Sequence, residues 1–161
     1  MSHPPHCLFV YPKFTAQSFW NYKEACELLG KKYPTSPLGL VTVAAMVPPA
    51  WRVKLVDLNV EKLKEKEVEW AELVFIGGMI FQQPEHLRLI DYFKSRRKKV
   101  IVGGPDPTSS PHLYDKADYL VLGEEGCPIP RNAASPAICV EGSCVAVGAI
   151  QCSGSAGSTG G

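Results

Sequence analysis

Three apolar segments of the chain each run into a glycine-rich turn, at 73–78, 100–105 and 119–124. Each segment is short and almost unbroken in its apolar character, which is typical of a strand covered on both faces of a parallel sheet. In such a sheet the carboxyl ends of the strands form the edge where ligands bind. Glycine lacks a Cβ atom, so it lets a ligand approach the backbone there. The sequence therefore predicts a ligand site at this edge.

Other residues with reactive side chains give weaker signals. Glu124 and Glu125 could act as acid and base, but adjacent residues at a strand end point to opposite faces and do not converge on one substrate. The chain has six cysteines and no C-x-x-C spacing, so a zinc ribbon, a thioredoxin motif and a standard iron–sulfur run are unsupported. We expect ordinary buried or free thiols and no metal site.

Composition limits the function classes. A chain of 161 residues that is 45% hydrophobic can form one domain with a substantial core. Its net charge of +1 gives no electrostatic reason to expect nucleic acid or an anionic membrane as a partner. No signal peptide is visible, and the apolar run 38–47 is too short to span a bilayer. We therefore expect a cytoplasmic protein.

Strand and helix patterns alternate along the chain, which predicts an α/β fold with a doubly wound parallel sheet. The expected strands are 7–11, 53–57, 73–76, 100–102 and 119–122. The expected helices are 18–29, ended by Gly30, then 38–46, 60–70, and a helix from Pro84 to the basic cluster 94–99, with a short loop or helix at 110–115. The first helix fits either a surface excursion or a lid.

The segment 38–46 is apolar nearly all round, and a helix without a polar face is normally buried. Gly39 near its start disfavours a helix by about 0.5–1 kcal/mol relative to alanine. Close packing or a ligand would explain its presence.

The last part of the chain differs in kind. Residues 127–161 contain no leucine, no aromatic residue, no lysine and no aspartate, and they end in a glycine- and serine-rich run. Such a composition buries too little to order itself. We expect a domain at 1–126 and a low-complexity, disordered or aberrant tail at 127–161.

Five motifs, each at an expected strand end or helix start, carry a family resemblance. They are Tyr11-Pro12-Lys13-Phe14, Pro37-Leu38-Gly39-Leu40, Val56-Asp57-Leu58-Asn59, Gly103-Gly104-Pro105-Asp106-Pro107-Thr108 and Leu122-Gly123-Glu124-Glu125. Taken in order, they resemble the amino-terminal cobalamin-binding domain of the cobalamin-dependent radical S-adenosylmethionine enzymes. The similarity covers about residues 7–126.

The resemblance implies a flavodoxin-like five-stranded sheet of order 2-1-3-4-5. The corrin would lie across the carboxyl ends of the strands, and its nucleotide tail would enter a slot beside them. A flat macrocycle needs low walls and accessible backbone rather than charged catalysts. The implied cofactor-binding residues are Gly39, Gly77, Gly78, Met79, Gly103, Gly104, Pro105, Thr108, Gly123, Glu124 and Glu125, and no catalytic residue is implied.

The chain departs from related families in two ways. Cobalamin proteins that ligate cobalt from below carry Asp-x-His-x-x-Gly after the first strand, whereas residues 12–18 contain neither histidine nor glycine. We therefore expect no lower axial histidine, and expect His3, His6, His86 and His112 to be surface residues. The C-x-x-x-C-x-x-C loop of the radical enzymes is also absent, so the iron–sulfur cluster and S-adenosylmethionine would belong to a missing carboxyl-terminal part.

The leading hypothesis is thus a cobalamin-binding module, truncated before the radical domain of a methyltransferase-like enzyme and inactive alone. The alternative is a non-binding remnant or a protein-interaction domain, in which the glycines only form turns. Surface left by a missing domain would be apolar, so we also expect possible self-association.

Overall fold

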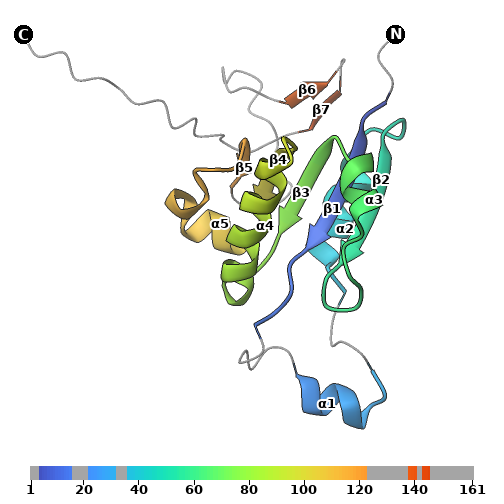
Figure 1. Ribbon diagram of the computed structural model, residues 1–161, viewed down its shortest axis with the longest axis vertical. Helices are drawn as coiled ribbons and strands as arrows, with labels where there is room; N and C mark the ends of the chain where they lie inside the picture. The colour runs from blue at the N-terminus through green and yellow to red at the C-terminus, as the bar shows by residue number, and fades with distance from the viewer. Residues whose placement is uncertain (1–3, 16–21, 32–35, 123–137, 141–142, 146–161) are drawn as a thin grey trace, which may run out of the picture.

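The computed structural model describes residues 4–15, 22–31, 36–122, 138–140 and 143–145. Five parallel strands form one sheet in the order β2-β1-β3-β4-β5 (Figure 1). The strands are β1 (His6–Tyr11), β2 (Arg52–Asp57), β3 (Leu73–Gly77), β4 (Lys99–Gly103) and β5 (Tyr119–Val121). The predicted doubly wound sheet of order 2-1-3-4-5 is confirmed.

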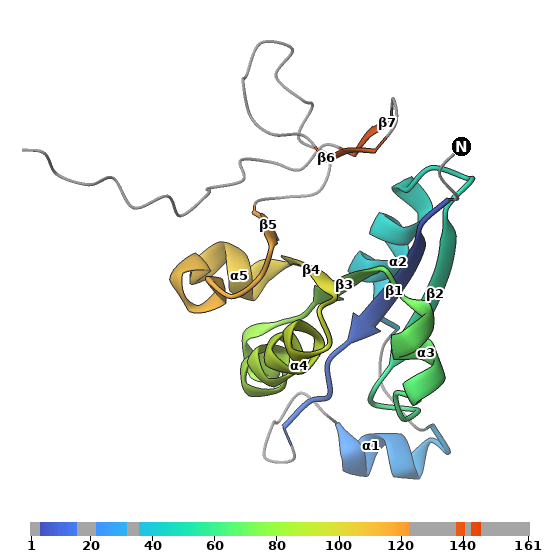
Figure 2. The ribbon, with the colours of Figure 1, turned by 45° about the horizontal axis from the view of Figure 1, so that its top comes forward.

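Helices cover both faces of the sheet (Figure 2). They are α2 (Leu38–Met46), α3 (Glu65–Trp70), α4 (Gln83–Ser95) and α5 (Pro105–Ser109), with 3-10 turns η2 (Ile80–Gln82) and η3 (Pro111–Tyr114). The helix α1 (Lys23–Leu28) lies apart from the sheet (Figure 1). On one face α2 packs against β1 and β3 through Leu40, beside Phe9 and Phe75. On the other face α3 and α4 pack through Val68, Leu89, Ile90 and Phe93. The sheet is the middle layer of three.

The alternation of side chains along β1 divides the core in two. Leu8 and Val10 point to the α3 and α4 face, whereas Cys7 and Phe9 point to the α2 face. All four are 0% exposed, so β1 is covered on both sides. This explains why the strand has no polar alternation in its sequence.

Two helices are shorter than the sequence suggested. α1 begins at Lys23, after Tyr22 in the left-handed region (φ 44°), and Gly30 at φ 62° follows it as expected. Residues 16–21 lie outside the described part. α3 begins at Glu65 rather than near Val60, because the Glu67 side chain accepts a hydrogen bond from the Lys64 backbone N–H at 2.9 Å and so closes the first turn there.

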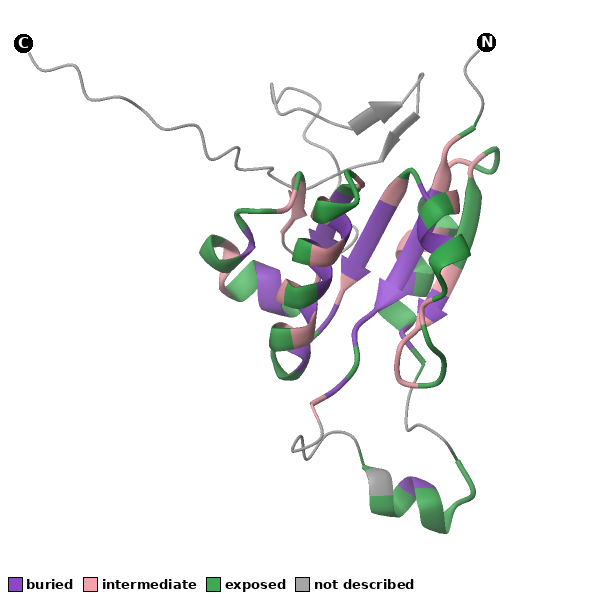
Figure 3. Ribbon diagram, viewed as in Figure 1, coloured by how far each residue is buried: buried purple, intermediate pink, exposed green. Residues whose placement is uncertain are grey.

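The expectation that α2 is buried was wrong. Leu40 is the one buried residue of this helix, while Leu38, Val41 and Met46 are 70%, 44% and 53% exposed (Figure 3). A helix has two sides, and the sheet covers only one of them. The other side of α2 has no cover from the part of the chain that the structure describes.

Part of the expected tail forms two short strands. β6 (Ile138–Val140) and β7 (Ser143–Val145) pair antiparallel, and the rest of 127–161 lies outside the described residues. The division of the chain at residue 126 therefore stays a prediction. Within the described ranges, no helix is long and apolar enough to cross a membrane.

Candidate functional site

The glycines that end β3 and β4 lie side by side. Gly77 pairs with Gly103 in the parallel register, so both turns begin at the same level of the sheet. A Cβ atom on Gly77 would lie 3.1 Å from Leu40 of α2, and one on Gly103 would lie 3.2 Å from the Val121 Cβ. Both contacts are tighter than side chains normally make. Neighbouring side chains thus already pack over these two glycines.

The next residue of each turn brings the two backbones together. A Cβ atom on Gly104 would lie 3.0 Å from the Gly78 carbonyl oxygen, and Gly104 has φ 107°, which L side chains rarely adopt. Gly78 is buried, whereas Gly103 and Gly104 are partly exposed. A glycine at 104 is therefore needed for the turn itself, whatever binds beside it.

The turn after β4 continues directly into α5. The Thr108 backbone N–H and hydroxyl both donate to the Gly104 carbonyl oxygen, at 3.1 and 2.8 Å. Pro105 occupies the first helical position, where its missing N–H leaves no hydrogen bond unmade. Pro105 and Thr108 are both exposed. They can border a ligand, but the Thr108 hydroxyl already has an acceptor.

A buried polar cluster supports α5 from below. Asp106 is 1% exposed and accepts hydrogen bonds from the Tyr114 hydroxyl and from the Gln83 amide, the latter at 2.9 Å. Burial, and then the hydrogen bond to Asp106, raise the pKa of Tyr114 well above its usual value, so Tyr114 remains a proton donor. The cluster joins α4, α5 and η3 beneath the glycine turn.

His86 of α4 was expected at the surface, and this was wrong. Its side chain is 0% exposed and packs edge-on against Tyr114, with ring centroids 5.0 Å apart. Neither ring nitrogen forms a hydrogen bond of good geometry, although the Ile76 carbonyl lies close enough to favour protonation slightly. Burial lowers the pKa of His86 to about 4, and the charge of Asp106 opposes this shift. His86 is a neutral core residue at neutral pH.

The other titratable candidates lie away from the edge. His6 begins β1 and stacks on Trp70, while His112 is exposed on η3, and His3 lies outside the described residues. Burial, and then the charge of Glu72, raise the pKa of the Cys7 thiol to about 12, which makes it unreactive. No group of three metal-ligating side chains occurs among the residues that the structure describes.

Apolar side chains form a rim beside the glycine turns. Met79, Ile80 and Phe81 follow Gly78 and are 44%, 58% and 38% exposed. Three consecutive exposed apolar residues at a strand end are unusual, because water contact with each is unfavourable by roughly 25 cal/mol per Å². This apolar rim fits a flat, largely apolar ligand lying over the carboxyl edge.

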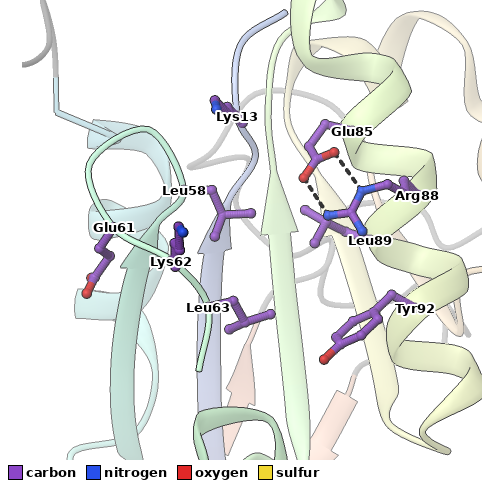
Figure 4. Close-up of a pocket in the computed structure, with 9 residues that line it drawn as sticks. All are labelled: Lys13, Leu58, Glu61, Lys62, Leu63, Glu85, Arg88, Leu89 and Tyr92. Carbon is purple, nitrogen blue, oxygen red and sulfur yellow. Dashed lines mark hydrogen bonds and ion pairs between the residues drawn. The ribbon is translucent and has the colours of Figure 1, made fainter. Parts of the chain in front are cut away.

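A cavity of about 320 Å³ opens next to the same edge, on the α3 and α4 face (Figure 4). Leu58, Leu63 and Leu89 provide its apolar part, and the Glu85–Arg88 ion pair at 2.7 Å stands on one wall. None of the predicted site residues lines it; the remaining lining residues are Lys13, Glu61, Lys62 and Tyr92.

The structure brings together most, but not all, of the predicted site residues. Gly77, Gly78, Met79, Gly103 and Gly104 converge on one edge, with Pro105 and Thr108 on the adjoining turn of α5. Gly39 lies in the first turn of α2 and is exposed. Gly123, Glu124 and Glu125 lie outside the described residues.

Sequence reasoning missed the polar side chains that support this edge. They are Gln82, Asp106 and Tyr114, which are buried, and Asn59, which is partly buried. Asn59 and Asp106 belong to motifs that had been singled out, so their position after a strand was the available signal. Gln82 is 0% exposed and had no such signal.

Comparison with known proteins supports one family. Residues 31–130 match the family described as B12 binding domain. An uncharacterised methyltransferase of Synechocystis sp. is 43% identical over 125 residues, covering 76% of this chain and 23% of the relative. The hopanoid C-2 methylase of Rhodopseudomonas palustris is 31% identical over 120 residues, covering 74% of this chain and 23% of the relative. No solved structure matches significantly.

The chain thus spans less than a quarter of the length of these curated relatives. The family match covers more than half of the 161 residues, and it includes four of the five strands and both glycine turns of the edge. The sheet order and the family match agree, and the chain belongs to the B12-binding domain family.

Proposed function

We propose that this domain binds cobalamin across the carboxyl ends of β3 and β4, as a module of a larger methyltransferase. The observation that carries the proposal is the apolar rim, Met79 to Phe81, standing beside the paired glycine turns. The rim offers the corrin an apolar support, and the glycine turns keep the neighbouring wall low. Burying a few hundred Å² of apolar surface at roughly 25 cal/mol per Å² would contribute several kcal/mol toward binding, against the cost of association.

The proposed contacts are those of the family resemblance. Met79 would lie beside the nucleotide tail, together with Gly77 and Gly78, and the partly exposed backbone at Gly103 and Gly104 would border the tail slot. The full set comprises Gly39, Gly77, Gly78, Met79, Gly103, Gly104, Pro105, Thr108, Gly123, Glu124 and Glu125. Bound cobalamin would supply cobalt-centred group-transfer chemistry, while these residues bind and orient it.

The loop after β1 supplies no histidine to the cobalt. Pro12 and Phe14 are buried, and Lys13 is exposed. His86 of α4 is 0% exposed and packs against Tyr114 in the core. We therefore propose that cobalamin binds here without a lower axial ligand from this loop.

The two named relatives suggest the reaction class. Both are methyltransferases by name, and each is several times longer than this chain. We propose that the iron–sulfur cluster and S-adenosylmethionine of a radical methyltransferase are held by protein outside this domain. The domain itself holds cobalamin.

One observation favours the alternative of a non-binding remnant or interaction domain. Leu40, Val121 and the backbone of Gly78 already pack against the glycines, so each glycine has a reason within the fold. A titration must therefore decide between the two functions.

Hydroxocobalamin should be titrated into the purified 161-residue chain and followed by its visible spectrum. We compare the natural chain with Met79→Lys, which puts a charge into the apolar rim, and with Met46→Lys. Met46 is also an exposed methionine, 53% against 44% for Met79, and it ends α2 near the amino ends of the strands. We expect saturable binding that Met79→Lys weakens about tenfold or more and Met46→Lys leaves unchanged. No binding by the folded natural chain would support the remnant.

A further inference from the structure

Two side-chain amides from different strands meet on one carbonyl oxygen. The Pro12 carbonyl, just after β1, accepts a hydrogen bond from Asn59 Nδ2 at 3.1 Å and another from Gln82 Nε2. Asn59 follows β2, and Gln82 ends η2 after β3. The ends of three neighbouring strands are therefore tied together at the Pro12 carbonyl.

Both amides also use their oxygen atoms. Gln82 Oε1 accepts the Met79 backbone N–H at 2.9 Å, and Asn59 Oδ1 accepts the Phe14 backbone N–H at 2.9 Å. Asp57 holds the Asn59 side chain in place, because its Oδ1 accepts from Asn59 Nδ2 at 2.7 Å. The amide nitrogen and oxygen of Asn59 and of Gln82 all have hydrogen-bond partners, and a polar network that is satisfied in this way is rigid.

This network lies at the switch point of the sheet. In the order β2-β1-β3-β4-β5 the connections from β1 and β3 leave in opposite directions, and open α/β sheets bind ligands at that crevice. In this chain the Gln82 side chain lies in that crevice. That side chain is 0% exposed, and a Cβ atom on Gly78 would lie 3.1 Å from Gln82 Oε1.

We propose that Gln82, together with Asn59, is a positioning residue: the two amides clamp the β1 loop to the β3 loop and so form the floor of the ligand site before cobalamin binds. The inference rests on the proposed function for the identity of the ligand. The clamp also gives the Tyr11–Phe14 and Val56–Asn59 motifs a role. Asp57 at the end of β2 orients the Asn59 side chain, and Asn59 holds the β1 loop.

A floor formed in advance increases affinity, because the loops need not be ordered during binding. Loss of Gln82 leaves the Met79 N–H without its acceptor and removes one donor from the Pro12 carbonyl. Losing one such buried hydrogen bond corresponds to about a tenfold change in an equilibrium constant. Gln82 makes two such hydrogen bonds, so we expect its loss to weaken cobalamin binding by at least that factor.

The test compares Gln82→Ala and Gln82→Glu with the natural chain. Gln82→Glu keeps an acceptor for the Met79 N–H but loses the donor to Pro12. Val68→Ala serves as the control, because it removes core volume on α3, away from the edge, and lowers stability without touching the clamp. Backbone amide hydrogen exchange is measured by NMR on the cobalamin-free chains, and hydroxocobalamin affinity is measured on all four.

The decisive amide is that of Phe14, whose own acceptor Asn59 is unchanged in both Gln82 variants. We expect exchange of the Phe14 amide to become at least tenfold faster in both Gln82 variants, and their affinity for hydroxocobalamin to fall by about tenfold or more. Val68→Ala should not change Phe14 exchange more than that of other amides, and it should leave the affinity unchanged. Unchanged Phe14 exchange, or unchanged affinity in a folded Gln82→Ala chain, would overturn the clamp. If the natural chain does not bind cobalamin, the proposed function fails, and Phe14 exchange still decides whether the clamp positions the loop.

Discussion

Gly104 meets Gly78 backbone to backbone at the carboxyl edge, where a Cβ atom on Gly104 would lie 3.0 Å from the Gly78 carbonyl oxygen. Gly104→Ala therefore adds both an unfavourable φ of 107° and a clash with main chain. We expect it to lower the free energy of unfolding by about 3 kcal/mol. Gly30→Ala is the matched control, because Gly30 has φ 62° and no atom within 4 Å of its added Cβ.

The control should lose only about 1 kcal/mol, the value for left-handed backbone alone. Urea denaturation of both variants measures the difference. Equal losses would mean that the two glycine turns are not in contact in solution.

The two leucines at the start of α2 test how that helix packs. Leu40 is 8% exposed and lies over Gly77, whereas Leu38 is 70% exposed. Because both substitutions change leucine to alanine in one helix, helix propensity changes equally. We expect Leu40→Ala to lower the free energy of unfolding by about 2–4 kcal/mol and Leu38→Ala by less than about 0.5 kcal/mol. A large loss with Leu38→Ala would show that its side of α2 is covered.

The exposed side of α2 is also an apolar surface suited to self-association. Val41 is 44% exposed between Leu38 and Met46, and contiguous apolar surface promotes association. We expect the natural chain to self-associate in sedimentation velocity experiments, and Val41→Lys to shift it toward the monomer. Ser95→Lys adds the same charge on α4, across the sheet, and should leave the distribution unchanged. If the natural chain is monomeric at high concentration, the prediction of self-association is wrong.

Because His86 is buried, it should make the folded chain less stable as the pH falls. Its pKa is lowered from 6.5 to about 4 in the folded chain. As the pH falls, the unfolded chain therefore takes up a proton on this histidine before the folded chain does. The folded state keeps its full stability above about pH 6.5 and loses stability progressively between about pH 6.5 and pH 4. The full loss corresponds to about 3 kcal/mol.

Urea denaturation at pH 7.5 and pH 5 measures the part of this loss that falls in that interval, about 2 kcal/mol. His86→Phe is the comparison, because phenylalanine keeps an aromatic ring against Tyr114. The variant should lose less stability than the natural chain over that interval. The same pH dependence in both chains would show that other groups cause it.

Much of this fold follows from local sequence. The strand segments were recognisable because each is an apolar run ended by glycine, proline or a polar residue, and parallel strands buried on both faces need that pattern. The α2 helix has the bounds Leu38–Met46 that its sequence indicated, with Pro37 before it and Pro48 after it. The glycines of the edge were recognisable because β3 and β4 both end in them.

Tertiary structure decided what covers each element and why each glycine is there. Local sequence makes α2 apolar nearly all round, but its burial depends on a second layer, and the described residues cover only the side that faces the sheet. His86 looked like a surface residue because a lone histidine has no pattern, whereas α4 turns it toward Tyr114. The hydrogen-bond network joins residues that are distant in the chain, namely Pro12, Asn59 and Gln82. They meet only because the strand order places β1 between β2 and β3. Contacts between distant residues are set by topology, so the sequence determined the elements of the edge and the tertiary structure determined its network.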